Sequence, residues 1–198
     1  MKVEENNTRR NLLISLSTLL LIVVVVGITY AFFRPSETNT AVTNVNINAF
    51  DQAVITFTGG SDLSMNAYQP GVSRELYFDV KLQSTGGDMS ASYDIIWQIT
   101  NNTFKHDETI GNENDAELLY SLYISQDQST WTAEFENKDA TALTGDVKLA
   151  TNHLVIASNG STARNYYKFV VTYPSLNKDQ SFNMESTLNS NIKIVPSV

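Results

Sequence analysis

Few side chains in this sequence could carry out chemistry. The 198 residues include no cysteine and two histidines, His106 and His153, which lie far apart along the chain. The lack of cysteine excludes thiol catalysis, thiolate metal sites and disulfides. No H-E-x-x-H segment is present, so the zinc-binding helix of a standard metalloprotease is absent. Ser161 with His153 could supply a nucleophile and a base, but no nucleophile elbow accompanies them, and we expect no catalytic residues and no enzyme.

The densest group of carboxylates lies in residues 106–117, with the sequence HDETIGNENDAE. Hard cations such as calcium bind several carboxylate oxygens, which makes Asp107, Glu108, Glu113 and Asp115 the candidate metal ligands. The alternative is a solvated acidic loop, which the sequence favours because the spacing matches no calcium-loop motif. We therefore expect no resident metal and no cofactor.

Aromatic side chains are the other candidates for recognition. Tyr77, Tyr123 and Tyr166 occupy the outward positions of segments that alternate as strands do. Tyrosines on such a face can form a platform for a sugar ring or a contact between subunits. The simpler interpretation is that β-propensity alone favours tyrosine on a sheet surface.

The elements that must position these side chains have the period of β-strands. Residues 74–82, 93–99 and 166–173 alternate between apolar and polar types, and turn clusters separate them from similar segments. We count about eight or nine such segments, with residues 101–116 as a long polar loop. Strands with one polar face are typical of antiparallel sheets, and two such sheets pack into a sandwich. The sequence predicts an all-β, antiparallel β-sandwich over residues 42–198.

A charge-free apolar segment, residues 11–33, precedes the predicted sandwich. Its length suffices for one hydrophobic helix across a bilayer core of about 30 Å. Lys2, Arg9 and Arg10 come before it, so the positive-inside rule makes residues 1–10 a cytoplasmic tail and places the rest outside. Residues 34–41 are polar and form the predicted linker.

The fate of this helix is open. Its length favours a permanent transmembrane anchor, whereas Thr29 and Ala31 put small residues at −3 and −1 of a signal cleavage between Ala31 and Phe32. The paired arginines also leave room for export by the twin-arginine route.

The basic N-terminus, the Leu/Val run and the ending G-x-T-Y-A-F-F resemble the signals that the SipW-type peptidase of Gram-positive bacteria removes. The turn Gln69-Pro70-Gly71, the alternating strand after it and the turn at Gly86 are similar to the matching segment of that group, which includes TasA fibre proteins and camelysin. The resemblance implies a jelly-roll-like sandwich and cleavage near Ala31, so that the mature chain begins around Ala31 or Phe32.

The same resemblance implies self-association into fibres. A freed segment containing Val42, Val45 and Ile47 would pair as a strand with a neighbouring subunit. Camelysin has been classed as a metallopeptidase, but no motif in this chain supports that activity, and we do not extend it to this protein.

Net charge limits the partners of the chain. With 13 basic and 21 acidic residues, the formal charge is −8, which argues against nucleic acid and anionic lipid headgroups as ligands. We predict an exported cell-surface structural protein, such as a fibre subunit of a biofilm matrix. The alternative is a membrane-anchored extracellular module for adhesion or glycan recognition. Either is expected at the outer side of the cell membrane, or in the extracellular matrix after cleavage.

Overall fold

The computed structural model describes residues 47–50, 53–60, 62–84, 86–109 and 115–197. Apart from the 3-10 turn η1 (Ser181–Asn183), every regular element in these ranges is a strand. The strands are β1 (Ile47–Phe50), β2 (Ala53–Gly59), β3 (Asp62–Ala67), β4 (Val72–Ser84), β5 (Met89–Asn102), β6 (Leu119–Ser125), β7 (Thr132–Asp139), β8 (Gly145–Ala157), β9 (Thr162–Tyr173) and β10 (Ser186–Ser197). The predicted all-β class is confirmed.

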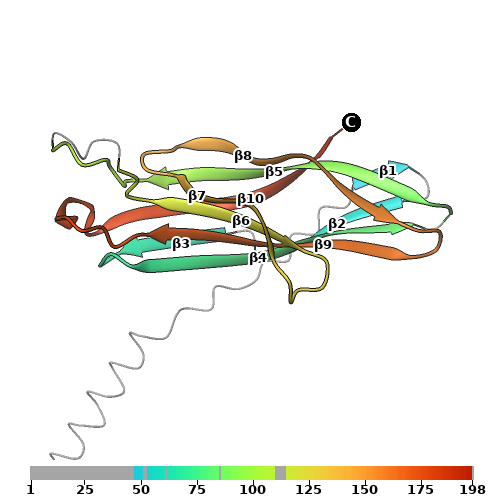
Figure 1. The fold of residues 1–198 in the computed structure, drawn as a ribbon. Coiled ribbons are helices and arrows are strands. Elements are labelled where there is room, and N and C mark those ends of the chain that lie inside the picture. The colour runs from blue at the N-terminus through green and yellow to red at the C-terminus, as the bar shows by residue number, and fades with distance from the viewer. Residues whose placement is uncertain (1–46, 51–52, 61, 85, 110–114, 198) are drawn as a thin grey trace, which may run out of the picture. The chain divides into compact units, whose positions relative to one another are not determined.

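The strands form two sheets (Figure 1). One has six strands in the order β1-β2-β4-β9-β6-β7, and the other has four in the order β3-β10-β5-β8. All eight strand pairings are antiparallel. The two-sheet antiparallel sandwich is therefore confirmed, and the jelly-roll-like topology stays a prediction.

The predicted helix over residues 11–33, the Ala31–Phe32 bond and the linker 34–41 lie outside the described residues. Within the part of the chain that the structure describes, no helix combines the length and apolarity of a membrane span. Of the predicted subunit-pairing residues, Val42 and Val45 are also outside. Ile47 lies in β1, where it pairs with Ile55 of β2 in the same chain.

Alternation along the strands sets the core against the outer faces. In β4, Phe78, Val80 and Leu82 are buried between the sheets, and the residues between them point outward. This follows from the two-residue period of an extended strand. The core is aromatic at its centre, where Trp97 of β5 is fully buried and its ring lies 5.1 Å from the ring of Phe169 of β9. Because β4 and β9 are neighbours, their outward residues form one continuous surface.

Two expected boundaries are wrong. The predicted loop over 101–116 starts too early, because β5 continues to Asn102, whose amide donates to the backbone oxygens of Ala140 and Leu143. The spacing of Trp131, Ala133 and Phe135 predicts a short strand that includes Trp131, but Trp131 precedes β7 and belongs to the β6–β7 loop.

Candidate functional site: an aromatic pocket on the six-stranded sheet

A pocket of about 360 Å³ opens on the outer face of the six-stranded sheet. Strands β2, β4 and β9 contribute to it, and so does the β6–β7 loop, residues 126–131. The side chains that matter for recognition are Thr58, Tyr77, Asp79, Gln128, Trp131 and Tyr166. We call this set the outer-face pocket.

Strand register brings these side chains together. Asp79 of β4 lies opposite Thr58 of β2 on one side and Tyr166 of β9 on the other. One step along the sheet, Tyr77 lies opposite Lys168. Directly opposite residues on one face of an antiparallel pair are about 4.5–5.5 Å apart at Cβ, close enough for side chains to touch. The register therefore places Thr58, Asp79 and Tyr166 in one row across the sheet, and Tyr77 and Lys168 in the next row.

Gly59 ends β2 at the rim of the pocket and has a φ of 132°. A Cβ at this position would lie 2.6 Å from the Cα of Phe78 and 2.7 Å from the backbone oxygen of Tyr77. Both the backbone angle and the close approach require glycine. This local packing lets β2 end against β4 without a side chain.

The β6–β7 loop is held by its own polar contacts. Asp127 Oδ1 accepts hydrogen bonds from the backbone N–H groups of Thr130 at 2.8 Å and Ser129 at 2.9 Å. These bonds hold the pKa of the Asp127 carboxyl well below its usual range. The loop ends at Trp131, whose ring meets that of Tyr77 edge-on, with centroids 5.9 Å apart. Trp131 is thus positioned by the loop before any ligand arrives.

Asp79 supplies a largely buried carboxylate to the pocket wall. It is 9% exposed, and burial raises its pKa although Arg164 and Lys81 oppose the shift. Among the described residues, its Oδ2 atom accepts no hydrogen bond, and the nearest cation, Arg164 Nη1, is 3.8 Å away. A buried carboxylate oxygen with incomplete partners is uncommon and favours a donor from outside the chain.

Lys168 lies between two tyrosines on neighbouring strands, Tyr77 at the pocket and Tyr123 next to it. The Tyr77 hydroxyl donates to Glu75 at 2.6 Å, which raises the pKa of Tyr77, and the Tyr123 hydroxyl donates to Glu136 at 2.8 Å. Lys168 Nζ lies 4.6 Å from the centroid of the Tyr123 ring and 5.6 Å from that of the Trp131 ring. Cation–π contacts of this kind fix the orientation of the rings. The aromatic surface is therefore ordered beyond the pocket itself.

The predicted aromatic candidates divide. Tyr77 and Tyr166 line the pocket, while Tyr123 lies next to it under Lys168. Sequence reasoning missed Asp79 and Trp131. Asp79 could have been found from the alternation of residues 74–82, which places it on the same outward face as Tyr77, but nothing in the sequence signals the loop geometry that presents Trp131.

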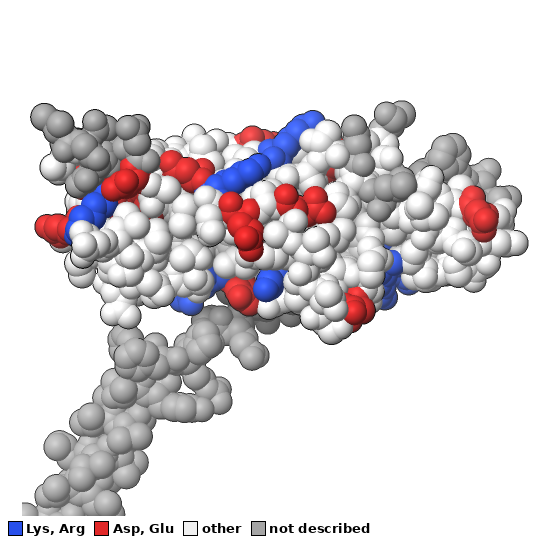
Figure 2. Space-filling view, viewed as in Figure 1, with Lys and Arg blue, Asp and Glu red and all other residues white. Residues whose placement is uncertain are grey.

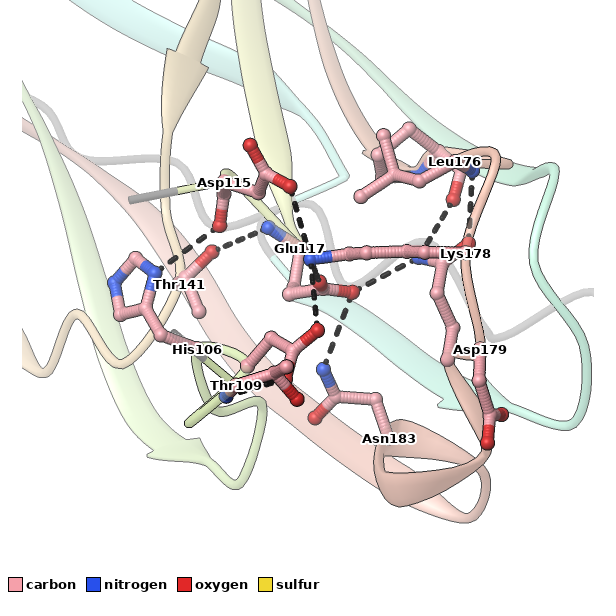
Figure 3. A network of polar contacts seen from close by, with 12 residues as sticks. His106, Thr109, Asp115, Glu117, Thr141, Leu176, Lys178, Asp179 and Asn183 are labelled. Carbon is pink, nitrogen blue, oxygen red and sulfur yellow. Dashed lines mark hydrogen bonds and ion pairs between the residues drawn. The ribbon is translucent and has the colours of Figure 1, made fainter. Parts of the chain in front are cut away.

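The acidic cluster is organised around a lysine instead. Lys178 Nζ lies 2.7 Å from Glu117 Oε1, 3.1 Å from Asp115 Oδ2 and 3.4 Å from Asp107 Oδ2 (Figure 3). Glu117, which was not among the candidates, is fully buried, and Gln180 Nε2 donates to its second oxygen at 2.9 Å. Burial opposes the charge on Lys178, but Glu117 and Asp115 outweigh it and raise the pKa of the lysine.

Of the other metal candidates, Glu108 is exposed and Glu113 lies outside the described residues. Among the residues described, no group of three His, Cys, Asp or Glu side chains is arranged to hold a metal ion. An ammonium group is thus the cation with which Asp107 and Asp115 pair.

The conceivable nucleophile and base do not meet as a pair. Ser161 Oγ donates to the backbone oxygen of Ser158 at 2.7 Å. Both ring nitrogens of His153 are engaged elsewhere, Nδ1 with the Tyr167 hydroxyl at 2.8 Å and Nε2 with Glu134 at 3.1 Å.

No family model and no curated protein matches this sequence. Among solved structures, a chain of infectious bursal disease virus, Gx strain, is 12% identical with a TM-score of 0.35, over 73% of this chain and 31% of the viral one. CpGH89CBM32-6 produced by Clostridium perfringens is 14% identical with a TM-score of 0.27, over 77% and 99% of the two chains. TmCBM61 in complex with beta-1,4-galactotriose is 8% identical with a TM-score of 0.27, over 72% and 88%. At these values the matches bear on neither ligand nor activity.

Proposed function

We propose that this chain is a surface-displayed saccharide-binding module and that the outer-face pocket is its binding site. One observation carries the proposal. An ordered pair of aromatic rings, Tyr77 and Trp131, stands beside a buried carboxylate, Asp79, whose Oδ2 accepts no hydrogen bond among the described residues. Sugars offer the complementary chemistry, because their C–H faces pack on aromatic rings and their hydroxyls donate to carboxylates.

The charges around the pocket favour a neutral sugar. Asp79 lines the pocket, and Glu75 and Glu136 bond Tyr77 and Tyr123, while Arg164 and Lys168 lie close by. Acidic and basic side chains are interspersed over the face shown in Figure 2, and the whole chain carries −8. This net charge disfavours an acidic polysaccharide and has no such effect on a neutral hexose.

The test is binding of the full-length chain, kept in mild detergent, to a panel of neutral oligosaccharides by glycan array and titration calorimetry. Trp131→Ala and Tyr77→Ala should each weaken binding at least about tenfold, as expected when a stacking ring is lost from a site of this kind. Tyr68→Ala is the matched control, because Tyr68 is 72% exposed and is not part of the outer-face pocket.

Three outcomes would overturn the proposal. One is the absence of binding to any neutral saccharide in the panel. Another is binding that the Trp131 and Tyr77 variants retain. Preference for a quaternary ammonium compound over sugars would also contradict it, since an aromatic pocket with a carboxylate suits such cations as well.

Display at the cell surface rests on residues 1–33 and stays a prediction, as does the choice between anchor and cleaved signal. Fibre formation through Val42, Val45 and Ile47 also stays a prediction. In the described part of the chain, Ile47 already has a strand partner in Ile55, so an exchange between subunits would have to replace this pairing.

A further inference from the structure

A chain of hydrogen bonds starts at the open edge of the sandwich. β7 and β8 are the terminal strands of their two sheets, and Glu134 of β7 meets His153 of β8, with Oε1 and Nε2 3.1 Å apart. The other ring nitrogen of His153 lies 2.8 Å from the hydroxyl of Tyr167 on β9. The two outer strands are thus linked through one imidazole to the interior.

The chain continues through the core to the pocket loop. The Tyr167 hydroxyl lies 2.5 Å from that of Tyr93 on β5, and both tyrosines are fully buried. Asn165 of β9 donates from Nδ2 to the Tyr93 hydroxyl at 2.8 Å. Gln126, the first residue of the β6–β7 loop, donates from Nε2 to Asn165 Oδ1 at 2.8 Å.

With a neutral imidazole the bonds all run in one direction. The Glu134 carboxylate can only accept, so the proton of the imidazole is on Nε2 and Nδ1 accepts from Tyr167. Tyr167 then accepts from Tyr93, which in turn accepts from Asn165. Burial raises the pKa of both tyrosines, that of Tyr93 to about 12, so both hydroxyls keep their protons. In this state the hydroxyls of Tyr167 and Tyr93 and the amide of Asn165 each have a hydrogen-bond partner.

A second proton on His153 conflicts with this direction. Nδ1–H would donate to Tyr167, whose hydroxyl would turn to Tyr93. Tyr93 would then receive bonds from both Tyr167 and Asn165, and its own proton would lose its acceptor in the core. An unsatisfied buried donor is costly. The conflict is relieved when the Asn165 amide turns its oxygen to Tyr93, and Gln126 must then turn its own amide so that Oε1 accepts from Asn165 Nδ2.

Gln126 connects this chain to the candidate binding site. It begins the loop that carries Gln128 and Trp131 to the outer-face pocket, and Tyr167 itself lies at the pocket. The groups that face the His153 ring are Glu134 from β7, Tyr167 from β9 and Tyr93 from β5.

We propose that His153 is a proton-sensitive switch that couples the β7–β8 edge to the pocket loop through this hydrogen-bond chain. Uptake of a proton by His153 reverses the chain as far as Gln126, and the turn of the Gln126 amide shifts the loop that presents Trp131. The predicted effect on ligand affinity rests on the proposed saccharide-binding function, whereas the effect on the loop does not.

The experiment follows the indole N–H resonance of Trp131 in the full-length chain from about pH 8 to about pH 5, where histidine side chains change charge. Trp131→Phe assigns the resonance. In the wild type, the Trp131 resonance changes its chemical shift over the same pH range as the ring resonances of His153. As pH falls, affinity for the bound neutral oligosaccharide decreases about three- to tenfold, the equivalent of one neutral hydrogen bond. His153→Gln removes both changes, since glutamine offers one donor and one acceptor but takes up no proton.

Two further variants keep the test decisive. His106→Gln is the matched control, because His106 contacts Asp115 and Asp139 in another loop network, and it should leave the Trp131 transition intact. Asn165→Ala removes the link between the two tyrosines and Gln126, so the Trp131 resonance should no longer shift between about pH 8 and about pH 5. A Trp131 resonance that is fixed in the wild type, or that still shifts in His153→Gln, overturns the proposal. If no oligosaccharide binds at either pH, the proposed function fails and the resonance alone decides the switch.

Discussion

The Lys178 network and the outer-face pocket are both built from charged side chains, but they treat their charges differently. In the network, Glu117 is fully buried and both of its oxygens have partners, Lys178 on one and Gln180 on the other. In the pocket, Asp79 is nearly as buried, but the cation beside its Oδ2, Arg164 Nη1, is 3.8 Å away, whereas Lys178 Nζ is 2.7 Å from Glu117 Oε1. Removing one partner of a closely paired buried charge is costly, whereas a buried charge with a distant partner can be replaced by a neutral group at little cost.

The Lys178 network and the outer-face pocket also differ in how far they are open to solvent. The Lys178 network ties together the β5–β6 and β9–β10 connections, and Asn183 Nδ2 also donates to the backbone oxygen of Lys105 there at 2.8 Å. The outer-face pocket is more open to solvent, and Tyr77 keeps 52% of its surface exposed. The network is thus expected to matter for stability and the pocket for binding. The following substitutions test that division.

The largest effect is expected for Lys178→Met. It leaves Asp107, Asp115 and Glu117 without their common cation, and removing one partner of a buried ion pair costs about 3–5 kcal/mol. Chemical denaturation followed by circular dichroism measures the free energy of unfolding. Lys148→Met is the matched control, because Lys148 pairs with Asp94 at the surface, where an ion pair contributes about 0–1 kcal/mol. Equal losses in the two variants would mean that the network is not a stabilising unit.

The second effect concerns the pocket rim. Gly59→Ala should cost about 3 kcal/mol, because it combines a strained φ with a collision against the backbone of Phe78. Gly87→Ala isolates the strain, since Gly87 has a φ of 138° and a Cβ there would meet nothing within 4 Å. We expect about 1 kcal/mol for it. If thermal unfolding shows the two variants to be equally stable, the close approach of β2 to β4 is not the constraint.

Part of the pocket could be predicted from the sequence. The alternation of residues 74–82 and 166–173 placed Tyr77 and Tyr166 on outer faces, because an extended strand leaves no other choice once its apolar face is buried. Which outward residues become neighbours depends on register, and register between β4 and β9 joins segments far apart in the sequence. Trp131 was misplaced for a different reason. Its position depends on the Asp127 turn, which a period of two cannot reveal.

Only part of the Lys178 network could be predicted. Clustering along the chain identified Asp107 and Asp115 as candidate metal ligands, although the spacing favoured a solvated acidic loop without a cation. The cation comes from the distant β9–β10 connection, and no local pattern signals that a lysine there will fold back onto them. The spacing along the chain therefore located the acidic cluster but not Lys178, which neutralises it.

The smallest expected effect on stability is also the sharpest test of the comparison. Asp79→Asn should leave the free energy of unfolding at pH 7 unchanged or raise it by up to about 1 kcal/mol, because it removes an incompletely paired buried charge. Its raised pKa gives the sign with pH. The folded state holds the Asp79 proton more tightly than the unfolded chain, so this contribution to stability is present below the unfolded pKa and is lost as pH rises through the folded one.

Wild type and Asp79→Asn should accordingly differ least in stability near about pH 3 and most near about pH 7, which lie on either side of the usual carboxyl range. The variant becomes more stable relative to the wild type as the Asp79 carboxyl ionises. Saccharide affinity at pH 7 should fall about tenfold in the same variant, since a charged acceptor is replaced by a neutral one. Denaturation at the two pH values and calorimetry at pH 7 measure the two quantities. A variant that loses stability at pH 7 and keeps its affinity would place Asp79 with the self-contained Lys178 network, as a structural charge.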